Sequence, residues 1–149
     1  MRLVVQRVKK AFVVSVEKKT KVGKIDIGLF VLVGIGEEDG KKDAEILADK
    51  LLKLRIMADE KGKMNLPVGD VKGSILVVSQ FTLYADTSEG NRPSFIKAAN
   101  PLKALKLYQC FVDRLKDGGV KVETGSFGEY MTIDAQLDGP VTILIDSTI

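Results

Sequence analysis

Two stretches of helical periodicity interrupt a chain whose other apolar segments alternate as β-strands do, and this order constrains the fold most. The first helix is predicted from about Lys41 to Met57, because apolar residues recur there on one face while lysines and acids occupy the other. The apolar positions are Ala44, Leu47, Leu51 and Leu54. A chain that changes between the two periods in this way is typical of an α/β protein.

The second helix has clearer boundaries. Asn100 is a good N-cap, Pro101 suits the first helical position, and Gly118-Gly119 can end the helix. We expect its apolar stripe to face the core. The stripe consists of Leu102, Leu105, Tyr108, Phe111, Val112 and Leu115.

Segments of strand character precede, separate and follow the helices. The first third, with "RLVVQRV", "AFVVSVE" and "KIDIGLFVLVGIG", predicts a meander whose "FVLVGI" is a central strand. The others are "KMNLPV", "GSILVVSQFTLYAD", "VKVET", "YMTIDAQ" and "VTILIDS". The fold class predicted is therefore α/β: a single domain over residues 1–149, with a mixed β-sheet or barrel and two main helices packed outside. The apolar "VTILI" strand also favours a homodimer.

Composition limits where the chain works and what it binds. The 149 residues are 45% apolar and 29% charged, as in soluble globular proteins, and the longest apolar run is far too short to span a bilayer. No signal peptide is recognisable, and the single Cys110 cannot form an intrachain disulfide, so we expect a cytoplasmic protein with no membrane partner. A net charge of +3 permits RNA binding without the dense basic signature of a dedicated nucleic-acid binder.

The chain contains no histidine, which restricts its chemistry. A Ser-His-Asp triad, a Cys-His pair and an imidazole general base are excluded. Zinc sites built from histidine or paired cysteine are excluded too, and the acidic residues show no ligand spacing, so we expect no metal and no cofactor. Any hydrolysis must obtain its proton transfer elsewhere.

Four segments stand apart from ordinary scaffold. In "SQFTLYAD", strand alternation places Ser79 and Phe81 on one face and Gln80 and Thr82 on the other, although a strand leaving the core explains the pattern as well. In "GNRPSF", the Arg92 guanidinium can bind phosphate and the Phe95 ring can offer a stacking surface. The alternative is that both side chains are simply solvated in a surface loop.

The other two segments lie towards the C-terminus. "TGSFGEYM" joins small residues to Phe127, Tyr130 and Met131, which either line an apolar slot or cap the core. In "LDGPVT", Gly139 and Pro140 form a turn signal before an apolar strand, with an X-Pro bond that can be cis. As a plain turn, this segment needs no function.

Taken together, the motifs resemble those of the D-aminoacyl-tRNA deacylase family, also called D-tyrosyl-tRNA deacylases. The motifs that carry the resemblance are "VVQRV", "GKMNL", "SQFTLYAD", "RPSF", "TGSFG" and "DGPVT", in order from the first residues almost to the last. The resemblance implies a homodimer, with active sites near the subunit interface, that hydrolyses the ester between a D-amino acid and the terminal adenosine of tRNA.

The resemblance also assigns residues. Ser79–Thr82 are expected to form the site, with Gln80, Phe81 and Thr82 in catalysis. Gly139 and Pro140, joined by a cis bond, are expected to enter the partner subunit's pocket and exclude L-amino acids. The remaining expected substrate-binding residues are Ser79, Arg92, Phe95, Phe127 and Met131. Two positions depart from the family pattern: Leu137 stands where asparagine is usual, and Glu129 where a small residue is common.

The expected mechanism follows from the missing base. Backbone N–H groups near Phe81 and Thr82 can stabilise an oxyanion, unless the sheet already pairs them. Thr82 has no histidine or lysine in its motif to activate it, so covalent catalysis ranks below assistance by the ribose 2'-hydroxyl. Selection against L-residues by collision predicts that glycyl-tRNA is also cleaved.

Two other classes of function are compatible with the residues alone. A non-catalytic RNA-binding module would use Arg92, Phe95 and the lysines, and would bind RNA in a salt-sensitive way without cleaving the ester. A small-molecule esterase or amidase would use Thr82, and would act on simple D-amino acid esters without the tRNA body.

Overall fold

The sheet is built around its first strand, β1 (Arg2–Ser15), in a computed structural model that describes residues 1–148. β1 pairs antiparallel with β8 (Met131–Asp146) along one edge. Along its other edge, the first half of β1 pairs with β3 (Gly28–Gly34) and the second half pairs with β2 (Thr20–Ile25). The segments "RLVVQRV" and "AFVVSVE" therefore form one strand rather than two. "YMTIDAQ" and "VTILIDS" likewise form the single strand β8, which bends where its register against β1 shifts, between Gln6 and Lys10.

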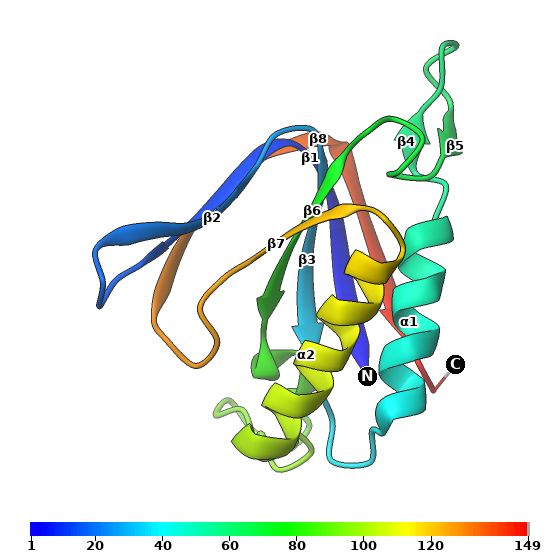
Figure 1. The fold of residues 1–149 in the computed structure, drawn as a ribbon. Helices are drawn as coiled ribbons and strands as arrows, with labels where there is room; N and C mark the ends of the chain where they lie inside the picture. Colours follow the sequence, from blue (N-terminus) through cyan, green and yellow to red (C-terminus); the bar gives the residue numbers. More distant parts are fainter. Residues whose placement is uncertain (149) are drawn as a thin grey trace.

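The parallel half of the sheet contains the strands reached through the helices. β3 pairs parallel with β6 (Ser74–Ser79), which pairs parallel with β7 (Lys121–Thr124). β3 lies between β1 and β6 and is almost wholly buried, so the prediction of a central strand is confirmed. A short hairpin, β4 (Met57–Ala58) and β5 (Met64–Leu66), projects away from the sheet (Figure 1).

Two helices lie side by side on one face of the sheet (Figure 1). α1 (Lys41–Lys53) ends four residues before the predicted Met57, because Leu54 is extended (φ −68°, ψ 119°) and leads into β4. α2 (Pro101–Asp117) begins and ends as predicted, with the Asn100 side chain accepting the Lys103 N–H at 3.0 Å. The main core fills the space between these helices and the sheet.

The α2 stripe is only partly as predicted. Tyr108, Phe111, Val112 and Leu115 are buried, but Leu102 is 83% and Leu105 44% exposed. Leu102 and Leu105 line an open hollow between α1 and α2 instead of the core.

A second, smaller apolar cluster occupies the opposite face, where the sheet curls. It contains Val8, Ala11, Val13, Ile25, Phe30, Leu76 and Val78. β2 closes over this cluster towards β7, so tightly that a Cβ at Gly23 would lie 2.4 Å from the Thr124 carbonyl oxygen. The predicted fold, a mixed sheet that nearly closes into a barrel with two helices outside, is confirmed. Among residues 1–148, no helix is long and apolar enough to cross a membrane.

Candidate functional site

The segment "SQFTLYAD" leaves the sheet at the end of β6. Ser79 is the last strand residue, and Phe81–Tyr84 form a 3-10 turn, η1. The predicted alternation therefore stops at Ser79, because Gln80 leaves the extended strand conformation (φ −147°, ψ 86°). Glycine makes room for the turn, since a Cβ at Gly34 would lie 2.9 Å from the Leu83 Cβ.

The backbone amides of η1 are available to a ligand. The Gln80 N–H donates to the Val33 carbonyl at 2.7 Å, and the Leu83 N–H donates to the Gln80 carbonyl at 3.3 Å. Between them, the N–H groups of Phe81 and Thr82 have no acceptor within residues 1–148. They lie beyond the sheet ladder, so the alternative that the sheet pairs them is wrong.

The side chains of η1 include no activated nucleophile. The Gln80 amide donates a hydrogen bond to the Thr82 hydroxyl. In the part of the chain described, no carboxylate, lysine or arginine hydrogen-bonds to that hydroxyl. A threonine needs a neighbouring base to attack an ester, and an amide donor is not one. Phe81 is 57% exposed beside it, so the site is open to solvent on this side.

The predicted "RPSF" loop packs against this turn. Phe95 meets Phe81 edge to face, with ring centroids 5.1 Å apart. Asp86 and Ser94 close the loop through two backbone hydrogen bonds of 2.8 and 2.9 Å. A hydrogen bond from Lys97, with others from Ser88, lowers the pKa of Asp86, so the carboxylate stays charged and holds the loop. Arg92 is exposed within it.

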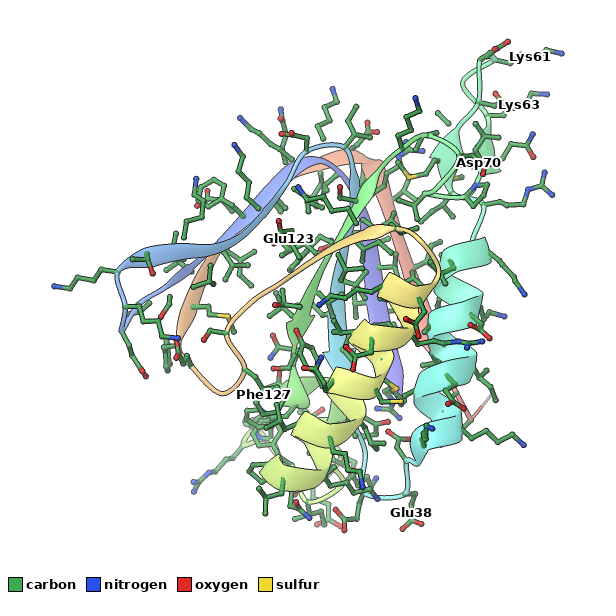
Figure 2. All side chains as sticks on the ribbon, viewed as in Figure 1. Glu38, Lys61, Lys63, Asp70, Glu123 and Phe127 are labelled. Atoms are coloured by element: carbon green, nitrogen blue, oxygen red, sulfur yellow. The ribbon has the colours of Figure 1, made fainter. Side chains whose placement is uncertain are left out.

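The "TGSFG" loop lies on the other side of the β6 end. The Gly125 N–H donates to the Val77 carbonyl at 3.0 Å, and the Ser126 N–H points at the Met131 sulfur at 3.3 Å. Phe127, which is labelled in Figure 2, packs on Tyr108 of α2, and their ring centroids are 5.5 Å apart. Phe127 and Met131 are thus partly buried near the predicted site.

Glu129, one of the two departures, anchors this loop. Its carboxylate accepts the Ser15 hydroxyl at 2.7 Å and pairs with Lys18 at 2.9 Å. The hydrogen bonds from Lys18, Ser15 and Ser126 lower the pKa of Glu129 to about 2. Glu129 therefore ties the loop to the turn between β1 and β2. The other departure, Leu137, is 43% exposed on β8.

Gly139 and Pro140 lie elsewhere in the same chain. Ser79 of β6 pairs with Val33 of β3, which pairs with Leu3 of β1. Leu3 in turn pairs with Ile145 of β8, so Ser79 and Ile145 lie at the same height in the sheet. Gly139 is six residues before Ile145 on β8, which places it on the order of 20 Å along the strands from Ser79, with two further strands between. One chain therefore does not bring this pair to Ser79–Thr82.

The Gly139–Pro140 peptide bond is cis, and its surroundings are ordered by Arg7. The Arg7 guanidinium pairs with the Asp138 carboxylate at 3.1 Å and donates to the carbonyl oxygens of Asp138 at 3.2 Å and Ile56 at 2.9 Å. Gly139 has φ +129°, a conformation that side chains disfavour.

Sequence reasoning missed the residues that hold η1 from behind. The Tyr84 hydroxyl donates to Asp39 at 3.2 Å, and Arg2 donates to the Leu83 carbonyl at 3.0 Å. The short sequence motifs give no signal for Asp39 or Arg2, because their partners are distant along the chain. A hollow of about 730 Å³ between α1 and α2 is lined by none of the predicted site residues.

Comparison with known proteins decides the family. The family model for D-Tyr-tRNA(Tyr) deacylase matches residues 4–146. The chain belongs to this family. The match spans both Ser79–Thr82 and the Gly139–Pro140 pair, so the predicted family is confirmed.

Relatives of this deacylase family cover nearly the whole chain. A D-aminoacyl-tRNA deacylase of Thermosipho melanesiensis is 55% identical over 149 residues, covering 99% of this chain and 97% of the relative. One from Thermotoga petrophila is 56% identical over 148 residues, covering 99% and 98%. A solved c-Myc DNA unwinding element binding protein has a TM-score of 0.90 at 38% identity, covering 98% of each chain. A probable eukaryotic D-amino acid tRNA deacylase, at 16% identity and TM-score 0.83 over 97% of each chain, shares the fold.

Proposed function

We propose that this chain hydrolyses the ester bond of D-aminoacyl-tRNA, releasing the D-amino acid and tRNA, and that it rejects L-amino acids. The names of the curated relatives support the substrate class. The observation that carries the proposal is the pair of amides on Phe81 and Thr82, which have no acceptor among residues 1–148, beside a hydroxyl that hydrogen-bonds to no base in that range. Such a protein would work in the cytoplasm on the acceptor end of charged tRNA.

The free amides suit the charge that develops during ester hydrolysis. When water attacks the ester carbonyl carbon, its oxygen becomes an oxyanion, which the Phe81 and Thr82 N–H groups would stabilise. Each well-placed donor contributes roughly 3 kcal/mol to such a transition state. The bond to the ribose oxygen then breaks, and a proton from the water ends on that oxygen.

The proton transfer is assigned to the substrate. The ribose 2'-hydroxyl would activate or position the water, while Thr82 and Gln80 shape the site, because neither carries a base. On tRNA ending in 2'-deoxyadenosine, turnover should fall steeply while the substrate still binds. Equal turnover on both tRNAs would contradict substrate assistance. Trapping of an acyl-enzyme, together with loss of turnover in Thr82→Ala, would favour covalent catalysis instead.

The second copy of the chain supplies the chiral filter in this proposal. Gly139 and Pro140 are too far from Ser79 of their own chain to line its pocket, and a second copy of the chain would bring them there. β8 is a 16-residue edge strand whose exposed apolar side chains favour such a partner. They are Ile133 at 38%, Leu137 at 43% and Leu144 at 77% exposure. A monomer at micromolar concentration in light scattering would contradict this arrangement.

Selection works by exclusion in this arrangement. The carbonyl oxygens of Gly139 and Pro140 would hold the α-amino group, so that a D-side chain points to solvent and an L-side chain meets the backbone. Side-chain identity should then matter little, and glycyl-tRNA should be cleaved. Intact glycyl-tRNA at high enzyme concentration would contradict exclusion as the mechanism.

The remaining site residues are assigned to the adenosine and the RNA end. Phe95 braces Phe81, and Phe127 and Met131 would wall the pocket from the other side of β6. The exposed Arg92 would bind a phosphate of the RNA end.

The functional class is tested by comparing D-tyrosyl-tRNA with D-tyrosine ethyl ester. Release of labelled tyrosine from the tRNA alone supports the deacylase. Turnover of both esters at similar rates would indicate a small-molecule esterase, and salt-sensitive RNA binding with neither ester cleaved would indicate an RNA-binding module.

A further inference from the structure

The second residue of the chain reaches the turn that carries the candidate site. Arg2 pairs with Gly34 of β3 on one side and with Asp146 of β8 on the other. Gly34 is also the residue over which η1 crosses, since a Cβ there would meet Leu83 and the Gln80 carbonyl. The sheet therefore places Arg2 at the end where β6 runs into η1.

The Arg2 guanidinium makes three different contacts there. NH1 donates to the Leu83 carbonyl at 3.0 Å. Nε donates to the Asp146 carboxylate at 2.8 Å. The Cζ atom lies 4.6 Å from the centroid of the Tyr84 ring. Only a planar guanidinium can bind a carbonyl, a carboxylate and an aromatic face at once, and a lysine ammonium cannot replace it.

The carboxylate that orients the guanidinium is itself fixed. Burial raises the pKa of Asp146, but hydrogen bonds from the Thr148 backbone and hydroxyl and from Arg2 outweigh it, giving a pKa of about 2. Asp146 is therefore ionised at neutral pH. Because Thr148 holds the Oδ1 atom of Asp146, the Oδ2 atom can orient the Arg2 guanidinium towards η1.

The contacted residues form the C-terminal half of η1. Leu83 lies against Gly34, and the Tyr84 ring lies so close to Gly36 that a Cβ there would be 2.7 Å from two ring atoms. Tyr84 also donates its hydroxyl to Asp39. The N-terminal half, Phe81 and Thr82, is exposed. The direction of the two free amides is therefore set by how the second half of the turn is held.

We propose that Arg2 is a positioning residue for deacylation, which fixes η1 through the Leu83 carbonyl and the Tyr84 ring and so aims the Phe81 and Thr82 amides. The inference rests on the proposed function of these amides. Arg2 acts through the turn and contacts none of Ser79–Thr82. Because its side chain is 46% exposed, its ion pair contributes little to global stability.

The chain offers a matched control. Arg114 is 47% exposed and pairs with Asp49 at 2.8 Å, so Arg114→Ala removes an equivalent charge and ion pair from α2, away from η1. Arg2→Ala should lower kcat on D-tyrosyl-tRNA about tenfold, the combined effect of one hydrogen bond and one cation–π contact, with KM within about twofold. Arg2→Lys should recover only part of the loss. Arg114→Ala should leave kcat unchanged.

Amide hydrogen exchange gives a readout that needs no activity. The Leu83 N–H bonds to the Gln80 carbonyl, and the Ala85 N–H bonds to the Thr82 carbonyl at 3.1 Å. Exchange of both amides should accelerate about tenfold in Arg2→Ala and stay at the wild-type rate in Arg114→Ala.

The two measurements separate the inference from the function. Unchanged exchange in Arg2→Ala would overturn the inference, and so would faster exchange with kcat unchanged in an active enzyme. If the wild type cleaves no D-aminoacyl-tRNA, the proposed function fails, and with it the role of Arg2 in deacylation. Exchange still decides in that case whether Arg2 fixes the turn.

Discussion

Asp39 is a buried carboxylate behind the candidate site, and its charge should contribute strongly to the stability of the fold. It is 6% exposed and pairs with the Met1 amino group, which is also buried. It also accepts the Gly36 N–H at 2.6 Å and the Tyr84 hydroxyl at 3.2 Å. Three donors thus converge on one carboxylate at the end of the loop that leads into α1.

Asp39→Asn keeps the shape and removes the charge. Asparagine has a single acceptor oxygen, and its NH₂ group must face at least one of the donors. The ammonium is then left buried without a counter-ion, a loss of about 3–5 kcal/mol. The total free energy of unfolding of such domains is about 5–15 kcal/mol. At about 2–4 °C per kcal/mol for this length, the melting temperature should fall by about 6–20 °C.

The control for Asp39→Asn is its neighbour. Glu38→Gln removes the same formal charge from an exposed side chain (Figure 2), and should change stability by less than about 0.5 kcal/mol. Urea unfolding of both variants at one protein concentration measures the difference, because a dimer would make stability depend on concentration. Equal losses in the two variants, or a loss under about 1 kcal/mol for Asp39→Asn, would refute the reasoning.

The remaining predictions concern Glu129, which anchors the "TGSFG" loop, and the core. The hydrogen bond from Lys18, with those from Ser15 and Ser126, lowers the pKa of Glu129 from 4.5 to about 2, so its ionised form stabilises the fold above pH 4.5. That stabilisation is lost as the pH falls from 4.5 through 2, and urea midpoints across this range should depend less on pH in Glu129→Gln. Phe111→Ala leaves a cavity where a side chain with 0% exposure was, and should lower the free energy of unfolding by about 3–5 kcal/mol. Leu102→Ala, at 83% exposure on the same helix, should change the free energy of unfolding by under about 0.5 kcal/mol. Similar losses of stability in the two variants would contradict the assigned core face of α2.

Local periodicity was enough to predict the elements whose signals are local. α2 carries its own N-cap, first-turn proline and terminal glycines, so both of its ends could be read from the sequence. The C-terminal end of α1 could not, because its apolar pattern continues past Lys53 into a segment that packs without being helical. β1 and β8 were each divided in two, since their continuity depends on pairing with one another rather than on local residues.

The candidate site divides in the same way. The motif that contains Ser79–Thr82 was identified from the sequence, but its alternation as a strand was wrong. The Val33 carbonyl and the glycines of β3 and the following loop receive η1 as a turn, and these are contacts with distant residues. Arg2, Asp39 and Tyr84 converge behind the turn only after folding. The family match covers this segment without assigning the residues that hold it.

The measurement that tests the central claim most directly is release of labelled tyrosine from D-tyrosyl-tRNA and L-tyrosyl-tRNA, side by side, by the wild type and by Gly139→Ala. Gly139 has φ +129°, and a Cβ there would lie 2.9 Å from the Val141 backbone nitrogen, so the substitution must shift the backbone of the proposed filter. We expect the wild type to cleave only the D-ester and the variant to discriminate less between the two. No cleavage of either ester by the wild type would contradict the deacylase function, and unchanged selectivity in Gly139→Ala would contradict the filter.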